Sequence, residues 1–534
     1  MDSSEKLQPP SPADRRYLRS WRLAVVIASL CLGTFLVALD INIIGTAVPR
    51  ITSDFDSLND LAWYGSAYLL AVTALQPALG TVYKFFDVKA TYLTSIVLFE
   101  AGSIVCAAAP NSTSFIVGRA VAGIGAAGLF QGALGIIGYT VALEKRPLYM
   151  GVVISVFGIS VCVGPVLGGV LTDHASWRWC FWINVPIGVV TLVLIFFTLT
   201  LEQSNELSRA LPLRDRLRHL DALGVISFVG AICCLLLALQ WGGQTLPWHS
   251  SRVIGLFIGF GILFIIFWYL QWKRDEYATI PLRVLRQRSI LMGSCYLLIL
   301  GMSSFAYNFF IPIFFQSAQG VSATTSGVRF IALIVPQVVF VIITGAVATK
   351  YGYYVPYIIL GTTVAIVGCG LITTINIDTP TVKWASFLAL NGVGMGTAMQ
   401  LPYTAVQVVL SDKDIPTGNA LFVFAWQLGG ALALSVCQSL LVSNLTSEIP
   451  RLIPSISPQA VIQVGAANLD ILTSDTGVLR QLRGAYAGAV RHTFIFALVA
   501  AAVSLPFACG MEWLKIKPAP KKEDLSGPSE EEVV

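Results

Sequence analysis

The sequence predicts an all-α polytopic membrane protein, built as two six-helix bundles with two extra helices inserted between them. Hydrophobic residues make up 55% of the 534 residues, and charged residues only 12%. The mean hydropathy of +0.75 excludes a soluble globular domain. Fourteen apolar runs reach the length of a membrane span, and a weak internal repeat relates the two ends of the chain.

Each predicted crossing is an apolar run bounded by polar or charged residues. A helix needs about 20 such residues to cross the hydrocarbon core of a bilayer. The runs lie at 22–48, 62–82, 92–109, 114–139, 148–172, 180–200, 222–241, 253–271, 290–315, 328–348, 355–376, 384–408, 418–442 and 492–514. Because fourteen is an even number, both termini should lie on the same side of the membrane.

Lysine and arginine are concentrated in every second connection between these runs, as short cytosolic loops require. Basic residues precede the first run, and others gather at 209–218 and at 273–288. We therefore expect both termini in the cytosol. The net charge of +5 follows from this topology, so we expect no nucleic acid as a partner.

Composition also predicts the boundaries of the parts. Polar tails that contain proline or end in acidic residues are typical of disorder. We expect a disordered N-terminus at 1–21, a first bundle at 22–200, linkers with two extra helices at 201–285, a second bundle at 286–514 with an exterior loop at 443–491, and a cytosolic tail at 515–534.

The run at 114–139 is studded with glycine and contains one arginine, Arg119. At 3.6 residues per turn most of the glycines share one side, where a neighbouring backbone can approach closely. An arginine at mid-membrane costs roughly 2.5 to 3.5 kcal/mol, so Arg119 should face protein and find a carboxylate. Asp40 and Glu100 are the candidates. The alternative is that Arg119 lies at a helix end and extends to the membrane surface.

These three charges predict a site for proton coupling. Asp40 lies roughly 12 Å below the exterior end of its run, at 1.5 Å per residue. A carboxylate in a dry site favours its neutral acid, whereas a nearby arginine favours the anion, so small movements can switch it. We predict that Asp40 is the proton acceptor, that Arg119 tunes the proton affinity of Asp40, and that Glu100 is a supporting carboxylate. Glu100 could instead be only a structural partner of Arg119.

The run at 148–172 contains a cluster of glycines around one proline. Proline removes a backbone hydrogen bond, and the glycines allow close packing at the resulting bend, which together predict a pivot. The predicted hinge consists of Gly158, Gly164, Pro165, Gly168 and Gly169.

Two glycine patterns indicate that the bundles are duplicated. Ala122-Gly-Ile-Gly125 matches Asn391-Gly-Val-Gly394, and Gln131 then falls on Gln400, at one offset of 269 residues. A pair of repeats predicts a central cleft between the halves.

Polar and aromatic side chains in that cleft would suit an amphipathic organic molecule better than an ion. The candidates for substrate binding are Gln131, Gln400, Asn308, Phe309, Gln316, Trp426 and Gln427. The alternative for each is a packed aromatic ring or an amide that hydrogen-bonds between helices. We expect no cofactor and no metal, because the four histidines are scattered without ligand spacing. Asn444-Leu-Thr446 matches a glycosylation acceptor.

Several motifs together resemble the major facilitator superfamily, in its fourteen-helix drug:proton antiporter branch and in the form found in fungal efflux pumps. They are Leu39-Asp40 with Ala47-Val48-Pro49, Gly118-Arg119 with Gly123-Ile-Gly125, Gly164-Pro165 with Gly168-Gly169, Trp177-Arg-Trp with Ile183-Asn-Val-Pro186, and Leu239-Gln-Trp-Gly-Gly243. Two positions depart from the pattern. Lys84-Phe85 stands where the superfamily has aspartate and arginine, so its usual charge latch cannot be transferred, and Ser160 replaces a glycine.

The resemblance implies the major facilitator fold and proton-driven export of a small organic substrate, such as a drug, toxin or secondary metabolite. It also implies a monomer in the lipid bilayer of the plasma membrane, with the vacuolar membrane as the alternative. Two rival functions share the fold, namely a proton-coupled importer of siderophores or nutrients and a membrane sensor that does not transport. An enzyme is not expected, because no catalytic cluster is visible in the sequence.

Overall fold

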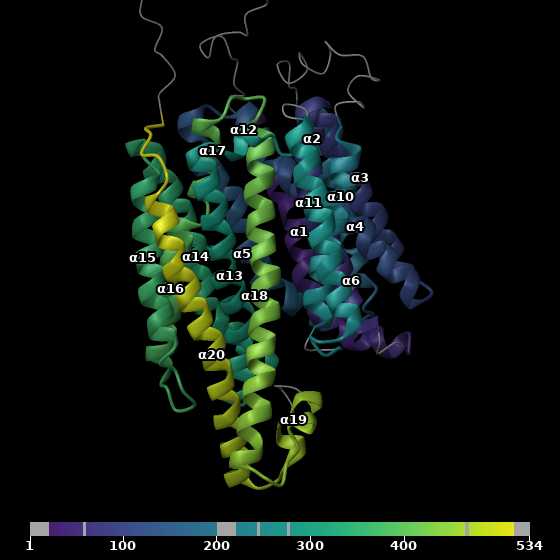
Figure 1. Ribbon diagram of the computed structural model, residues 1–534, viewed down its shortest axis with the longest axis vertical. Coiled ribbons are helices and arrows are strands. Elements are labelled where there is room, and N and C mark those ends of the chain that lie inside the picture. The colour runs from purple at the N-terminus through teal and green to yellow at the C-terminus, as the bar shows by residue number, and fades with distance from the viewer. Residues whose placement is uncertain are drawn as a thin grey trace, which may run out of the picture.

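The protein is a bundle of long helices that run roughly parallel to one another (Figure 1). The computed structural model describes residues 21–56, 60–199, 220–242, 246–274, 278–464 and 469–516. We call the end of the bundle that contains Trp21, Phe85 and Ile415 the inner end, and the end that contains Asp54 and Ser112 the outer end. The inner end is at the top of Figure 1.

The described helices fall into two halves joined by an insert. The first half contains α1 (Trp21–Asp54), α2 (Leu61–Phe85), α3 (Val88–Ala107), α4 (Ser112–Thr140), α5 (Arg146–His174), α6 (Trp179–Trp182) and α7 (Asn184–Thr198). The insert contains α10 (Ala222–Trp241), α11 (Ser251–Arg274) and α12 (Leu282–Leu285). The second half contains α13 (Arg288–Ser317), α14 (Ala323–Tyr351), α15 (Val355–Ile372), α16 (Thr381–Ala398), α17 (Leu401–Val409), α18 (Ile415–Leu452), α19 (Pro458–Val464) and α20 (Thr476–Cys509).

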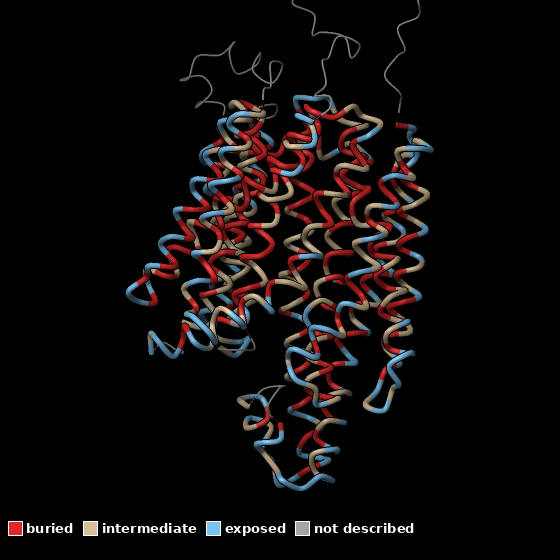
Figure 2. The backbone as a smooth tube through the Cα atoms, turned by 180° about the vertical axis from the view of Figure 1, so that it is seen from behind, coloured by how far each residue is buried: buried red, intermediate tan, exposed pale blue. Residues whose placement is uncertain are grey.

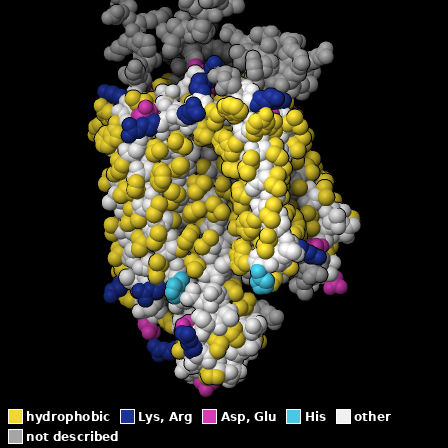
Figure 3. Space-filling view, viewed as in Figure 1, with side chains coloured by type: hydrophobic (Ala, Val, Ile, Leu, Met, Phe, Trp, Pro, Cys, Tyr) yellow, Lys and Arg dark blue, Asp and Glu magenta, His cyan; other side chains and the backbone are white. Residues whose placement is uncertain are grey.

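Twelve helices in the described ranges are long and apolar enough to cross a membrane. All fourteen apolar runs of the sequence overlap a described helix, but α2 and α16 are not among the twelve, so fourteen crossings remain a prediction. Hydrophobic side chains cover the middle of the face shown in Figure 3, and lysine and arginine gather towards its two ends. This is the surface of a multi-pass membrane protein.

Polar residues fix where several helices begin. Asp87 accepts a hydrogen bond from the Ala90 amide at the start of α3, and Asn111 accepts one from the Ser114 amide at the start of α4. These side chains satisfy amides that the first turn of a helix leaves unpaired. The start of α4 thereby sets the depth of Arg119, which is two turns further along the same helix.

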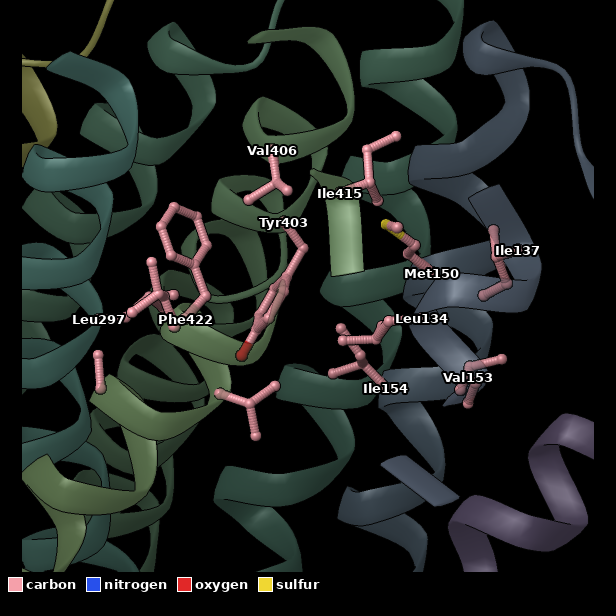
Figure 4. Close-up of a cluster of buried hydrophobic side chains, with 14 of the residues drawn as sticks. Leu134, Ile137, Met150, Val153, Ile154, Leu297, Tyr403, Val406, Ile415 and Phe422 are labelled. Carbon is pink, nitrogen blue, oxygen red and sulfur yellow. The ribbon is translucent and has the colours of Figure 1, made fainter. Parts of the chain in front are cut away.

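The two halves are joined at the inner end. Helices α2 and α18 pack against each other, as do α5 and α14. One buried hydrophobic cluster draws on both halves, and Figure 4 shows Leu134 and Met150 of the first half facing Tyr403 and Ile415 of the second. Inner residues of both halves are therefore removed from solvent together.

At the outer end each half has its own hydrophobic core. The cluster around Phe115 and Trp177 contains only residues of the first half, and the buried members of the cluster around Phe314 and Tyr486 all come from the second half. In Figure 2 the two bundles converge towards the top of the view and separate towards the bottom. The chain is thus closed at the inner end and parted at the outer end.

The expected exterior loop at 443–491 is largely helical. Helix α18 has 38 residues and continues to Leu452, and α20 has 34 residues and begins at Thr476. At 1.5 Å per residue α18 is about 57 Å long, well beyond the roughly 30 Å hydrocarbon core. Figure 1 shows the outer ends of α18 and α20 projecting past the other helices, with α19 beside them.

A buried carboxylate, Asp221 at the start of α10, holds the parts of the insert together at the inner end. Asp221 Oδ2 accepts a hydrogen bond from Gln271 Nε2 of α11 at 2.7 Å, and Asp221 Oδ1 lies 3.3 Å from Arg274 Nε. Gln271 Oε1 in turn accepts from the Ile280 amide at 2.8 Å. These bonds position the segment that leads into α12.

Candidate transport site

The centre of the first half holds one buried ion pair, between Asp40 of α1 and Arg119 of α4. Arg119 Nη1 lies 2.5 Å from Asp40 Oδ2, and the exposed fractions of the two side chains are 1% and 0%. Arg119 Nε donates to the Tyr64 carbonyl at 2.9 Å, and its guanidinium lies 4.4 Å from the centre of the Tyr68 ring. Asp40 and Arg119 depend on each other, because removing either side chain would leave the other charge buried without a counter-ion.

Glycines of α4 allow the close packing that directs Arg119 into this site. A Cβ atom at Gly125 would collide with the Phe99 backbone of α3, and one at Gly123 would collide with the Tyr68 backbone of α2. Glycine therefore lets α4 approach both neighbours closely. Held between α2 and α3, α4 directs Arg119 towards the Asp40 carboxylate of α1 and the Tyr64 carbonyl of α2.

A buried amide, Asn184 of α7, completes the surroundings of the ion pair. Asn184 Nδ2 lies 3.5 Å from Asp40 Oδ1 and 3.3 Å from Ser103 Oγ of α3, and donates towards both. Sequence reasoning did not assign this residue. The signal was available, because Ile183-Asn-Val-Pro186 is an asparagine in an apolar run beside a proline.

Glu100 lies on α3 within the same half, but the structure gives it no bond to Arg119. Its exposed fraction is 9%, and neither carboxyl oxygen has a hydrogen-bond partner among the described residues. The carboxyl group lies against the backbone of Gly188 in α7, where an added Cβ would collide with it. The structure thus brings Asp40 and Arg119 together and places Glu100 beside Gly188 of α7, without a bond to either of them.

A second set of charges, Lys84, Arg283 and Asp414, lies at the inner end and is called the inner latch below. Lys84 Nζ of α2 lies 3.0 Å from Asp414 Oδ1, and Arg283 Nη2 of α12 lies 2.8 Å from Asp414 Oδ2. Burial raises the pKa of the Asp414 carboxyl, but the Arg283 hydrogen bond and the Lys84 charge outweigh it, so the pKa lies below its ordinary value of 3.8. The carboxylate is therefore ionised and joins the first half, the insert and the second half.

The family model described as Major Facilitator Superfamily matches residues 30–434. The chain belongs to the major facilitator superfamily. Among its relatives, the "MFS-type efflux pump MFS1" of Trichophyton rubrum is 43% identical over 93% of this chain and 92% of that protein.

Two further relatives have similar names. The "Efflux pump aflT" of Aspergillus parasiticus is 40% identical over 94% of this chain and 97% of that protein. The "Aspyridones efflux protein" of Neocamarosporium betae is 40% identical over 93% of this chain and 88% of that protein. Among solved structures, the human organic anion transporter MFSD10 superposes with a TM-score of 0.54 at 15% identity, covering 90% of this chain and all of that one. This likeness shows the shared fold.

The predicted hinge of this major facilitator protein lies in α5, between α1 and α14. A Cβ at Gly158 would collide with the Val338 side chain of α14, and one at Gly164 would collide with Asn42 of α1. Pro165 lies within the same helix, and Gly168 and Gly169 follow it. Helix α5 thus contacts helices of both halves, and its bending during transport stays a prediction.

The repeat-related glutamines lie at the inner contact between the halves, where their own bonds hold them. Gln131 Nε2 donates to the Pro416 carbonyl of the second half at 2.5 Å, and Gln400 Nε2 donates to the Val341 carbonyl at 3.0 Å. Both side chains are buried. The Gln131 bond joins the two halves at the closed inner end, whereas the Gln400 bond lies within the second half, and a role of either residue in substrate binding stays a prediction.

The other substrate candidates lie on α13 and α18, which pack against each other. Trp426 is half-buried, with its ring 6.0 Å from that of Phe305. Phe309 is exposed to 54%, and Gln316 donates to the Pro312 carbonyl of its own helix at 3.3 Å. Asn308 and Gln427 are half-buried. The role of these five residues in binding stays a prediction.

Proposed function

We propose that the protein is a proton-coupled secondary transporter that exports amphipathic organic molecules by alternating access. Family membership supports transport, and the printed names of its relatives support efflux. The observation that carries the proton-coupled mechanism is the buried ion pair of Asp40 and Arg119. A pair that is costly to bury in a membrane core and that holds a titratable carboxylate supports a role in proton coupling.

The ion pair supplies a switch. Protonation of Asp40 would remove its charge and leave the Arg119 guanidinium buried without a counter-ion, which is unfavourable by several kcal/mol. The halves would then favour the arrangement that rehydrates or re-pairs Arg119. With the inner end closed and the outer end parted, Asp40 is poised to receive a proton from the outer side.

The inner end is assigned to the cytosol. Lys84, Arg146 and Arg283 lie there, as the positive-inside rule requires for cytosolic connections. We place the protein in the plasma membrane as a monomer with both termini cytosolic, and assign it no enzymatic activity. Protons and a small organic molecule are its partners. Asn444, a possible glycosylation acceptor, lies in the outer part of α18.

Transport in inside-out vesicles tests this proposal. A panel of fluorescent amphipathic dyes should accumulate in vesicles that contain the protein, and the accumulation should collapse when a protonophore removes the proton gradient. Asp40→Asn should abolish gradient-driven accumulation, because an amide cannot cycle between acid and anion. Glu448→Gln is the matched control, because Glu448 is an exposed carboxylate on the outer part of α18.

Other outcomes would redirect the assignment. Dye movement out of these vesicles on acidification of the lumen would indicate a proton-coupled importer. Binding without movement would indicate a sensor. Full gradient-driven accumulation by Asp40→Asn would remove Asp40 from the mechanism.

A further inference from the structure

Glu100 is a buried acid for which the ion pair provides no partner. Its exposed fraction is 9%, and both carboxyl oxygens lack hydrogen bonds among the described residues. A carboxylate anion in such a place would cost far more than a neutral carboxylic acid, since nothing repays its lost hydration. The neutral acid, with its proton bound, is the form that fits this environment.

The space around Glu100 is shaped for a carboxyl group. Gly188 of α7 leaves room that an added Cβ would fill, because that atom would overlap the Glu100 carboxyl group. Asn184 lies one turn before Gly188 on the same helix and therefore on the same face. Helix α7 thus presents bare backbone to Glu100 and an amide to Asp40.

Asn184 links Asp40 to α3, the helix that carries Glu100. Its Nδ2 donates towards Asp40 Oδ1 at 3.5 Å and Ser103 Oγ at 3.3 Å, and Ser103 precedes α3's outer end by one turn. Glu100 is three residues from Ser103 on α3, so it lies about 4.5 Å nearer the inner end. Glu100 also lies against Gly188, which is one turn nearer the inner end of α7 than the Asn184 that contacts Asp40. A proton that moved from Asp40 to Glu100 would therefore move inwards.

The charged and titratable groups near this junction are few. Helix α1 contributes Asp40, α4 contributes Arg119, and α7 has no ionisable side chain between Asn184 and Thr198. The Tyr68 hydroxyl of α2 and the thiols of Cys106 in α3 and Cys180 in α6 also lie within electrostatic reach of Asp40, and all three are neutral groups. On α3 itself the nearest ionisable group towards the inner end is Tyr92, whose hydroxyl lies against Gly33 of α1. One positive charge thus faces two carboxyl groups, and one anion is enough to neutralise it.

We propose that Glu100 is a second proton-binding site, and that Asp40 and Glu100 share a single negative charge against Arg119. In the present state Asp40 is the anion and Glu100 holds a proton. When Asp40 takes up a proton from the outer side, Glu100 can release its own towards the inner side. One proton is bound and one is lost, so the junction stays neutral overall. The inference rests on the proposed proton coupling, and it adds a route through the first half that is separate from the cleft between the halves.

Infrared titration of the purified protein tests this without any substrate. The carbonyl stretch of protonated carboxyl groups should persist at neutral pH in the wild type and be lost in Glu100→Gln. In Asp40→Asn the competing charge is gone, so the same band should disappear at a pH about one unit lower or more. Glu448→Gln should leave the band unchanged.

Two results would overturn the inference. One is a neutral-pH band that Glu100→Gln leaves intact, and the other is a band whose titration midpoint Asp40→Asn does not move. If Glu100→Gln does not fold, the titration of Asp40→Asn still tests the inference. Thermal unfolding of both variants shows whether each one folds. Because the titration involves no transport, it can fail while proton-driven dye accumulation stands, and the reverse also holds.

Discussion

At the scale of single residues, the buried guanidinium of Arg119 decides the chemistry of the first half. It uses separate nitrogens for the Asp40 carboxylate and the Tyr64 carbonyl, and its flat face lies over Tyr68. A lysine has one compact charge and could not reproduce this set of contacts. The site therefore depends on the shape of the cation as well as on its sign.

Replacing this cation should be severe. Arg119→Leu leaves Asp40 buried without a counter-ion, which should lower the free energy of unfolding by about 3 to 5 kcal/mol. Arg119→Lys should give a smaller loss because it keeps the charge. Thermal unfolding in detergent measures both, with Arg451→Leu as the control, since Arg451 forms an exposed pair with Glu448. Equal stability of Arg119→Leu and Arg451→Leu would contradict the importance of the buried pair.

Sequence reasoning located Asp40 and Arg119 because charges in apolar runs are conspicuous and need partners. It could not tell whether Glu100 pairs with Arg119, since that depends on how α3 is rotated about its axis. Asn184 was missed because an amide in an apolar run carries no charge that demands a partner. Rotation and neutral polar contacts are tertiary properties, so composition and spacing alone do not contain them.

At the scale of elements, glycine determines how closely α4 approaches its neighbours. Gly125 and Gly135 belong to the same glycine-rich face predicted from the sequence, yet their surroundings differ. An added Cβ at Gly125 meets the Phe99 backbone, whereas one at Gly135 has no neighbouring atom within 4 Å. Helical periodicity identifies the face, and only the packed structure separates the two positions.

This difference gives a matched pair of variants on one helix. Gly125→Ala should destabilise the protein by about 1 to 3 kcal/mol, because backbone cannot yield as a flexible side chain can. Gly135→Ala should be neutral or stabilising by up to about 1 kcal/mol, since alanine is the better helix former. Thermal unfolding of the two variants side by side provides the measurement. A similar loss in both would show that helix propensity, not close approach, governs α4.

At the scale of the whole molecule, the inner latch joins parts that lie far apart in the sequence. Asp414 is fully buried and accepts from Lys84 of α2 and Arg283 of α12. Sequence analysis noted Lys84 only as a departure from the family pattern. Its partner could not be predicted, because Asp414 lies in a connection 330 residues away. Sequence reasoning also expected Gln131 and Gln400 in the cleft between the halves, but it could not tell which end of that cleft is closed in this state.

Weakening the latch should open the inner end more often. In a background without native cysteines, Met150→Cys reports this opening, because Met150 is fully buried between the halves. Lys84→Gln should increase its labelling by a membrane-impermeant maleimide several-fold, and Lys84→Arg should restore protection. Lys350→Gln, an exposed lysine at the inner end of α14, is the control. Unchanged labelling in Lys84→Gln would exclude a latching role.

The latch should also be insensitive to pH in the cellular range. Because the folded-state pKa of Asp414 is depressed, its stabilising contribution is complete above the ordinary value of 3.8 and is lost only as pH falls through the lower folded value. The ratio of Met150→Cys labelling with and without Lys84→Gln, taken at the same pH, should therefore stay flat from about pH 5 to pH 8. A steep change of that ratio within the window would mean that Asp414 loses its charge there.

Arg283 connects the insert to the second half through its ion pair with Asp414. Asp221 and Gln271 hold the segment that leads into α12. Helix α12 in turn positions Arg283 beside the Asp414 carboxylate, which joins the two halves. Excising α10 and α11 would therefore not simply shorten the chain to a twelve-helix relative. It would also remove the support that positions Arg283, and Lys84 would then be the only cation of the inner latch paired with Asp414.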